Sequence, residues 1–199
     1  MSQAFNGTLA YSINTAGAIA GLYYDLGFVI HGFLRAANGA ITTFDAPGAG
    51  SDPAQGTLAY SINAGEDIAR YYTDASGSNH GFLRAAAGGI TTFDAPGAGT
   101  GAGQGTISRS IDAPGVTVGY FLDSNSTKHG FVHAAGGAIV TFDAPGAGNA
   151  ALQGTIAESI NRTGSVAGVY VDVNNVSHGF LLTPAGAAIR PAKPPGVPL

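Results

Sequence analysis

The chain contains no cysteine, and charged residues make up only 10% of its 199 residues. The lack of cysteine excludes a disulfide framework and a thiolate metal site. Eight Lys and Arg residues against twelve Asp and Glu residues give a net charge of −4, and the basic residues are scattered along the chain. Nucleic-acid binding needs clustered Lys and Arg opposite the phosphates. Nucleic acid is therefore not an expected partner.

Long hydrophobic runs are also missing. No apolar stretch approaches the ~18 residues that a membrane-spanning helix needs, so no membrane span is expected. Residues 1–6, "MSQAFN", have neither the basic region nor the apolar region of a secretory signal. This chain is therefore expected to carry no signal peptide.

The chain is rich in glycine, with 32 residues, and in repetition. The phrase "TTFDAPGAG" at 42–50 returns unchanged at 91–99, and again at 140–148 with Val140 in place of the first Thr. The tripeptide "HGF" recurs every 49 residues, beginning at His31, His80, His129 and His178. A fixed period of this length is the signature of a repeat protein. We predict a single repeat domain over residues 1–199.

The repeats have a common internal division. In the first unit four short segments, "GTLAYSIN", "AIAGLYYD", "IHGFLRA" and "AITTFDAP", are joined by the short connections that antiparallel hairpins use. We predict an all-β four-bladed β-propeller with four antiparallel strands in each blade. An alternative is a homodimer in which two chains form one larger eight-bladed ring. The expected blades cover about 7–55, 56–104, 105–153 and 154–190, followed by a C-terminal tail at 191–199.

The repeated phrase is predicted to form the corner between units. Pro47 suits position i+1 and Gly48 position i+2 of a type II turn, since glycine supplies the positive φ. In the fourth unit the Phe and Asp positions hold Pro191 and Ala192, because no fifth unit follows. The Asp of the phrase is expected to cap its own corner through an Asx-type bond. This Asp is present three times, as Asp45, Asp94 and Asp143.

Each unit also contains an Asp and a His six residues apart. These are the pairs Asp25–His31, Asp74–His80, Asp123–His129 and Asp172–His178. Across a hairpin the two side chains of a pair could face one another. The pair is then either a buried hydrogen bond that locks the blade or part of a ligand site.

We expect neither catalysis nor a bound metal or cofactor. An Asp-oriented His needs a nucleophile within reach, and the recurring serines belong to a strand face of small residues near the axis. These serines are Ser12, Ser61, Ser110 and Ser159. The Asp/Asn-containing loops, such as "DSNSTK", lack the closing carboxylate of a tight calcium site. As hairpin turns they need no ion.

The order Tyr or Phe, one residue, Asp, five residues and "HGF" resembles the bacterial extracellular repeats named after a His-Ala-Phe motif. The four copies read "YYDLGFVIHGF", "YTDASGSNHGF", "FLDSNSTKHGF" and "YVDVNNVSHGF". The resemblance covers essentially the whole chain. It implies a repeat β-protein that is exported to the cell surface or the extracellular space.

Composition and family resemblance together favour a non-enzymatic carbohydrate-binding protein, a lectin, with several similar shallow sites. Tyr can stack on the apolar face of a sugar, while Asp, Asn and Arg can hold its hydroxyls. The candidate sugar-binding residues are Tyr23, Asp25, His31, Arg35, Tyr72, Asp74, His80, Arg84, Asp123, His129, Tyr170, Asp172 and His178. The alternative is a structural or protein-interaction repeat module of an exported protein, with no small-molecule ligand. One divergent position, held by Tyr11, Tyr60, Arg109 and Glu158, is expected to face solvent.

Overall fold

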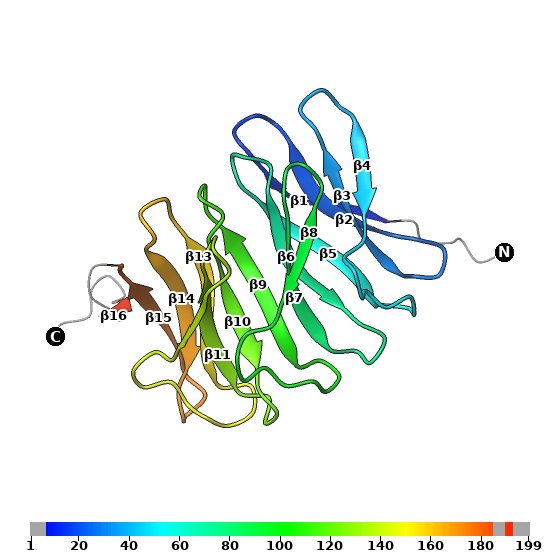
Figure 1. Cartoon of the computed structure of the whole chain (residues 1–199). Coiled ribbons are helices and arrows are strands. Elements are labelled where there is room, and N and C mark those ends of the chain that lie inside the picture. Colours follow the sequence, from blue (N-terminus) through cyan, green and yellow to red (C-terminus); the bar gives the residue numbers. More distant parts are fainter. Residues whose placement is uncertain (1–6, 185–189, 193–199) are drawn as a thin grey trace.

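The short apolar segments form strands throughout residues 7–184 and 190–192, the part of the chain that a computed structural model describes (Figure 1). The first unit consists of β1 (Thr8–Ile13), β2 (Ile19–Tyr24), β3 (Ile30–Arg35) and β4 (Ile41–Phe44). The second consists of β5 (Gly56–Ile62), β6 (Ile68–Thr73), β7 (Asn79–Arg84) and β8 (Ile90–Phe93). The third consists of β9 (Gly105–Ile111), β10 (Thr117–Leu122), β11 (Lys128–His133) and β12 (Ile139–Phe142). The fourth consists of β13 (Gly154–Ile160), β14 (Val166–Val171), β15 (Ser177–Leu182) and β16 (Arg190–Ala192).

Consecutive strands of a unit pair antiparallel, as the hairpin spacing predicts. The third strand of each unit then forms a short parallel pair with the first strand of the next unit, for example Ile30 with Gly56. The prediction of an all-β chain with four antiparallel strands per unit is therefore confirmed. The fourth unit reaches two residues into the segment expected to be a tail, because β16 includes Pro191 and Ala192. Residues 193–199 lie outside the described residues.

The units form an open row and not a ring. Figure 1 shows them following one another from the N-terminal to the C-terminal end, with the two ends on opposite sides of the molecule. The first strands of neighbouring units contact each other in the order β1, β5, β9, β13. The sheet starts at β1 and ends at β16, so the ring of the predicted four-bladed propeller is not closed. The recurring contacts join neighbouring units of the row. Contacts of this kind are compatible with an open stack as well as with a closed ring, so the sequence repeat alone does not require closure.

The repeated phrase fastens each unit to the next. Gly48 has φ +91° and the Ala49 amide donates to the Ala46 carbonyl at 3.0 Å, so the predicted type II turn is confirmed. The Ala46 amide donates at 2.9 Å to the hydroxyl of Thr57, a fully buried residue of the following unit. Thr106 and Thr155 accept the equivalent bonds in later units.

The core lies between the units. One phenylalanine in each of the last three units is buried completely or nearly so, namely Phe82, Phe131 and Phe180. Each packs edge-on against the phenylalanine of the preceding unit's repeated phrase, as Phe82 does against Phe44 with ring centroids 6.1 Å apart. Ala20 and Leu22 on β2 are also buried. Within the row, each sheet is therefore covered by its neighbours.

Candidate functional site

The four Asp–His pairs predicted from the six-residue spacing come together in the structure. The antiparallel register of β2 and β3 places Tyr23 opposite His31, and Asp25 follows two residues later at the hairpin. His31 Nε2 lies 3.7 Å from Asp25 Oδ2. The corresponding distances for His80, His129 and His178 are 3.3, 3.7 and 3.0 Å. The expected proximity is confirmed in all four units.

A second carboxylate contacts three of these histidines, and the sequence interpretation missed it. Asp45 Oδ1 lies 2.9 Å from His31 Nδ1, and His80 and His129 have the same partner in Asp94 and Asp143. The expected Asx-type role of these aspartates is therefore wrong. Gly32 pairs with Phe44, the last residue of β4, and Asp45 directly after the strand therefore lies beside His31. The fourth unit has Ala192 at this position.

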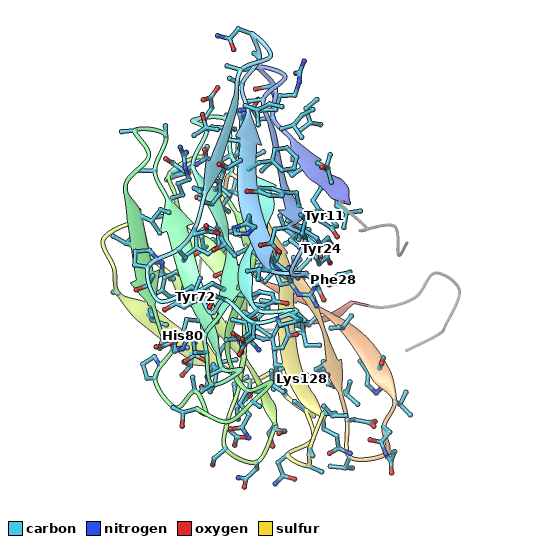
Figure 2. The ribbon with its side chains drawn as sticks, turned by 90° about the vertical axis from the view of Figure 1, so that its right-hand side faces the viewer. Tyr11, Tyr24, Phe28, Tyr72, His80 and Lys128 are labelled. Carbon is cyan, nitrogen blue, oxygen red and sulfur yellow. The ribbon has the colours of Figure 1, made fainter. Side chains whose placement is uncertain are left out.

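Each of these histidines also stacks on an aromatic ring of the preceding strand. The ring centroids are 4.9–5.0 Å apart, and the partners are Tyr23, Tyr72, Phe121 and Tyr170. Figure 2 shows Tyr72 next to His80. Tyr72 and Tyr170 are only 7% and 8% exposed, and Tyr72 lies under the Gly48 corner of the first unit. These two predicted sugar-stacking tyrosines are thus packing residues.

The two carboxylates that contact His80 favour the protonated form of its imidazole. Burial alone would lower the pKa of His80, but the hydrogen bond and charge of Asp94, followed by those of Asp74, outweigh it and raise this pKa above its ordinary value. Burial would raise the pKa of Asp74, but hydrogen bonds from Ser76, Ser78 and His80 lower it. A His held by carboxylates at both nitrogens ties strands together and has no free nitrogen for a substrate.

The two predicted arginines occupy different environments. Arg35 is exposed at the N-terminal end of the row, whereas Arg84 is 6% exposed and its guanidinium lies 5.0 Å from the centre of the Phe44 ring. Burial lowers the pKa of Arg84. Arg84 is at the opposite end of β7 from His80, so the structure does not join them in one site. Its contact with Phe44 is a packing contact between units.

The divergent position of the repeat is a β-bulge. In each first strand the register shifts around this residue, as between Ala59 and Ser61 in β5. Tyr11 stacks on Tyr60 with ring centroids 3.6 Å apart. Arg109 Nε lies 3.5 Å from Glu158 Oε2. Tyr11 and Glu158 are exposed as expected, but Tyr60 and Arg109 are half-buried between neighbouring units.

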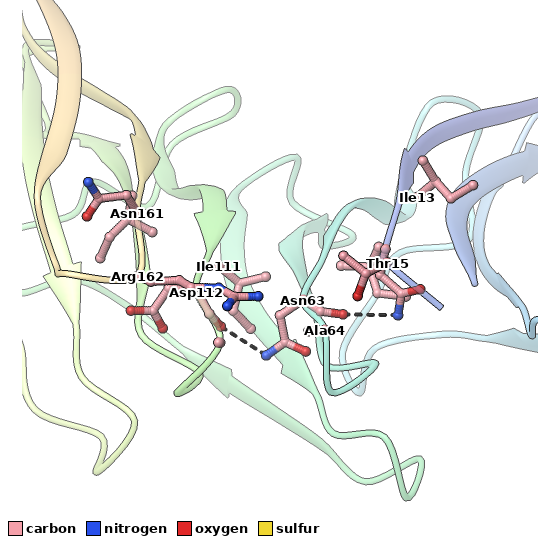
Figure 3. A pocket seen from close by; sticks show the side chains of 12 residues that line it. Ile13, Thr15, Asn63, Ala64, Ile111, Asp112, Asn161 and Arg162 are labelled. Carbon is pink, nitrogen blue, oxygen red and sulfur yellow. Dashed lines mark hydrogen bonds between the residues drawn. The ribbon is translucent and has the colours of Figure 1, made fainter. Parts of the chain in front are cut away.

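A groove with a cavity volume of about 380 Å³ crosses the row where the first strand of every unit ends (Figure 3). Each unit contributes an Ile, an Asn or Asp, and the residue after it. The lining residues are Ile13, Asn14, Thr15, Ile62, Asn63, Ala64, Ile111, Asp112, Ala113, Ile160, Asn161 and Arg162. The groove therefore combines aliphatic side chains with amide, carboxylate and guanidinium groups.

A ladder of asparagine side chains runs along this groove and stops at Asp112. The side-chain amide of Asn14 donates to the backbone carbonyl of Asn63 at 3.2 Å. The side-chain amide of Asn63 donates in turn to the backbone carbonyl of Asp112 at 3.0 Å (Figure 3). An ionised Asp cannot donate the next bond. Asp112 Oδ1 accepts from the Val116 amide. Within residues 7–184 and 190–192, neither Asp112 Oδ2 nor Asn161 Nδ2 has a hydrogen-bond partner.

The sequence interpretation did not identify the groove. Its only signal is the recurrence of "SIN" in three units and "SID" in the third. The Asn residues look like ordinary hairpin-turn residues, and they do have this role: Asn63 Oδ1 accepts from the amides of Gly65 and Asp67. That four turns from four units meet in one groove depends on how the units stack.

The described part of the chain holds no group of three or more His, Cys, Asp or Glu side chains suited to a metal ion. It also contains no helix with the length and apolarity that crossing a lipid bilayer requires. No protein-family model matches the chain, and no curated protein is significantly similar to it. The resemblance to the His-Ala-Phe repeats therefore stays a prediction that depends on the motif spacing.

Proposed function

We propose that the chain is a non-enzymatic carbohydrate-binding protein and that the groove across the four first strands binds a neutral sugar. A sugar presents an apolar face of C–H groups and a rim of hydroxyls, so its site needs aliphatic or aromatic surface beside a few polar groups. The groove offers both. Its volume of about 380 Å³ lies within the range of small-molecule sites.

The observation that carries this proposal is the interruption of the asparagine ladder at Asp112. Asp112 Oδ2 offers an acceptor and Asn161 Nδ2 a donor, and both groups line the groove. A carboxylate and an amide together can hold two neighbouring hydroxyls, each of which both donates and accepts. Ile111 and Ile160 from the same two units supply aliphatic surface beside them.

The Asp–His clusters support the proposal less well than the groove. Asp45, Asp94 and Asp143 are about half exposed, with side-chain values of 52%, 52% and 53%. Both oxygens of each carboxylate, however, already lie within 3.0 Å of a histidine nitrogen. A hydroxyl would have to compete with that interaction. We therefore place the sugar in the groove at Asp112, where the repeat is interrupted, and not at the repeated Asp–His pairs.

A paired substitution tests this assignment. Asp112→Asn keeps the shape of the side chain and the oxygen that accepts from the Val116 amide, but it replaces the free Oδ2 acceptor with the donor that the ladder lacks, so the fold is retained. Calorimetry against a panel of neutral monosaccharides and oligosaccharides is expected to detect binding to the native chain at about −4 to −8 kcal/mol, the range of millimolar to micromolar affinity. Asp112→Asn should abolish that binding. Asp94→Asn, the matched control in an Asp–His cluster, should leave it unchanged.

The reverse result would place the sugar at the Asp–His clusters and contradict the groove assignment. The alternative function, an interaction module without a small-molecule ligand, is favoured by the apolar residues exposed at both ends of the row, such as Ile13 and Leu181. Export to the cell surface or the extracellular space is also proposed, on the motif resemblance alone.

A further inference from the structure

The N-terminal end of the row exposes residues that later units bury. Leu9 is 41% exposed, whereas its counterpart Leu58 is 8% exposed and packs against the first unit. Ile13 is 67% exposed, whereas its counterpart Ile62 is 7% exposed in the same interface. Thr8 is exposed as well, although the equivalent threonines of the later units are completely buried. In the later units the equivalent surface is covered by the preceding unit. In the first unit no preceding unit covers it.

The C-terminal end exposes the opposite half of the same contact. Leu34 of the first unit is 6% exposed and packs against the second unit, whereas its counterpart Leu181 is 42% exposed. Ala20 is completely buried in that contact, and its counterpart Ala167 is exposed. The two ends therefore carry complementary surfaces. Inside the chain, the equivalent surfaces of neighbouring units pack against each other.

Polar groups at the C-terminal end point to the same conclusion. Between the second and third units, the Ser61 hydroxyl accepts from the Ile111 amide at 3.2 Å. Between the first and second units, the Asn14 side chain donates to the Asn63 carbonyl. Ser159 and Asn161 occupy these two positions in the last unit, and neither makes the equivalent bond within the described ranges. Their counterparts on a following unit would be the Ile13 amide and the Asn14 carbonyl.

We propose that a second copy of this chain docks head to tail, so that its first unit packs against the last unit of the first copy. The junction would repeat the contact between neighbouring units: Ile13 of one copy covers Ala167 and Leu181 of the other, as Ile62 packs with Ala20 and Leu34 inside the chain. Exposed apolar surface of this kind marks an association site. Because the two halves differ, the contact is heterologous, and it generates either a closed ring or a longer row. This inference does not rest on sugar binding, but the two proposals share the Asn161 side chain, whose Nδ2 donates either to a sugar or to the Asn14 carbonyl of the next copy, so association is measured without sugar.

Sedimentation equilibrium of the full chain tests the proposal. We expect the native chain to form dimers or larger assemblies at concentrations up to about 1 mM. Ile13→Asp and Leu181→Asp each place a charge in the junction, and both residues are exposed within one chain, so both variants should fold. Each variant alone should be monomeric. The control is Leu26→Asp: Leu26 is 70% exposed, its counterparts Ala75, Ser124 and Val173 are exposed in every unit, and association should persist.

Mixing the two variants tests the head-to-tail geometry. Ile13→Asp keeps an intact C-terminal end and Leu181→Asp an intact N-terminal end, so an equimolar mixture should form a heterodimer through the one remaining junction. A mixture that stays monomeric overturns the head-to-tail geometry. A native chain that is monomeric at about 1 mM, or an assembly unaffected by both substitutions, overturns the proposal as a whole.

Discussion

His80 lies between two carboxylates, and this arrangement links the charge of its imidazole to folding. A protonated imidazole can donate from both nitrogens at once, one to each carboxylate. In the unfolded chain this double interaction is lost. At the residue scale, the charge of His80 therefore links pH to the stability of the second unit.

We predict that stability falls as the pH rises above about 6.5, the ordinary pKa of histidine. The folded pKa of His80 is raised above its ordinary value of 6.5, so its stabilising contribution is complete below that value and is lost as the pH rises through the folded pKa. Thermal unfolding of the native chain should show this decline. His80→Gln, which cannot titrate, should show a flatter profile over the same pH range; an identical profile would contradict the coupling.

Removing one histidine should also destabilise the chain at a fixed pH. His80→Ala leaves Asp74 and Asp94 without their partner and is expected to cost roughly 1–3 kcal/mol in the free energy of unfolding. His178→Ala is the matched control, because His178 contacts only Asp172 among the described carboxylates. Denaturant unfolding should give a smaller loss for His178→Ala. Equal losses would mean that the second carboxylate contributes nothing.

The turn formed by the repeated phrase, as at residues 46–49, is the element that joins each unit to the next. Its amides are satisfied by the next unit, since Ala46, Ala95 and Ala144 each donate to a buried threonine hydroxyl. The corner is therefore stable only when a following unit is present.

A threonine substitution tests this role of the corner. Thr106→Val preserves the shape of a fully buried side chain but leaves the Ala95 amide without an acceptor, which should cost roughly 1–3 kcal/mol. Thr8→Val changes the same repeat position in the first unit, where the residue is exposed, and should be nearly neutral. The comparison uses equilibrium unfolding of both variants. A neutral Thr106→Val would show that the bond does not hold the units together.

Strand positions and turn type could be predicted from sequence because both depend on local patterns. The segments predicted in the first unit match β1 to β4, and Pro47–Gly48 forms the predicted turn. The role of Asp45 could not be predicted from its neighbours, since its partner His31 is 14 residues away across a strand pair. Asp25 and His31 were found because a single hairpin joins them.

At the scale of the whole molecule, the sequence period fixes the number of units but not how the row ends. Closure into a propeller depends on the small rotation between neighbouring units, to which many side chains contribute. The groove depends on the same rotation, because it forms only where Asn14, Asn63, Asp112 and Asn161 are brought together. The open row and the groove therefore depend on the arrangement of the units, which local sequence patterns do not determine.

Binding of a neutral sugar in the groove can be tested with a glycan array. The native chain and Asp112→Asn would be applied side by side to a broad array, followed by titration with free sugars up to millimolar concentrations. We expect the native chain to retain a small set of neutral glycans and Asp112→Asn to retain none of them. Silence of the native chain across the array and the titration would contradict carbohydrate binding and favour the interaction module.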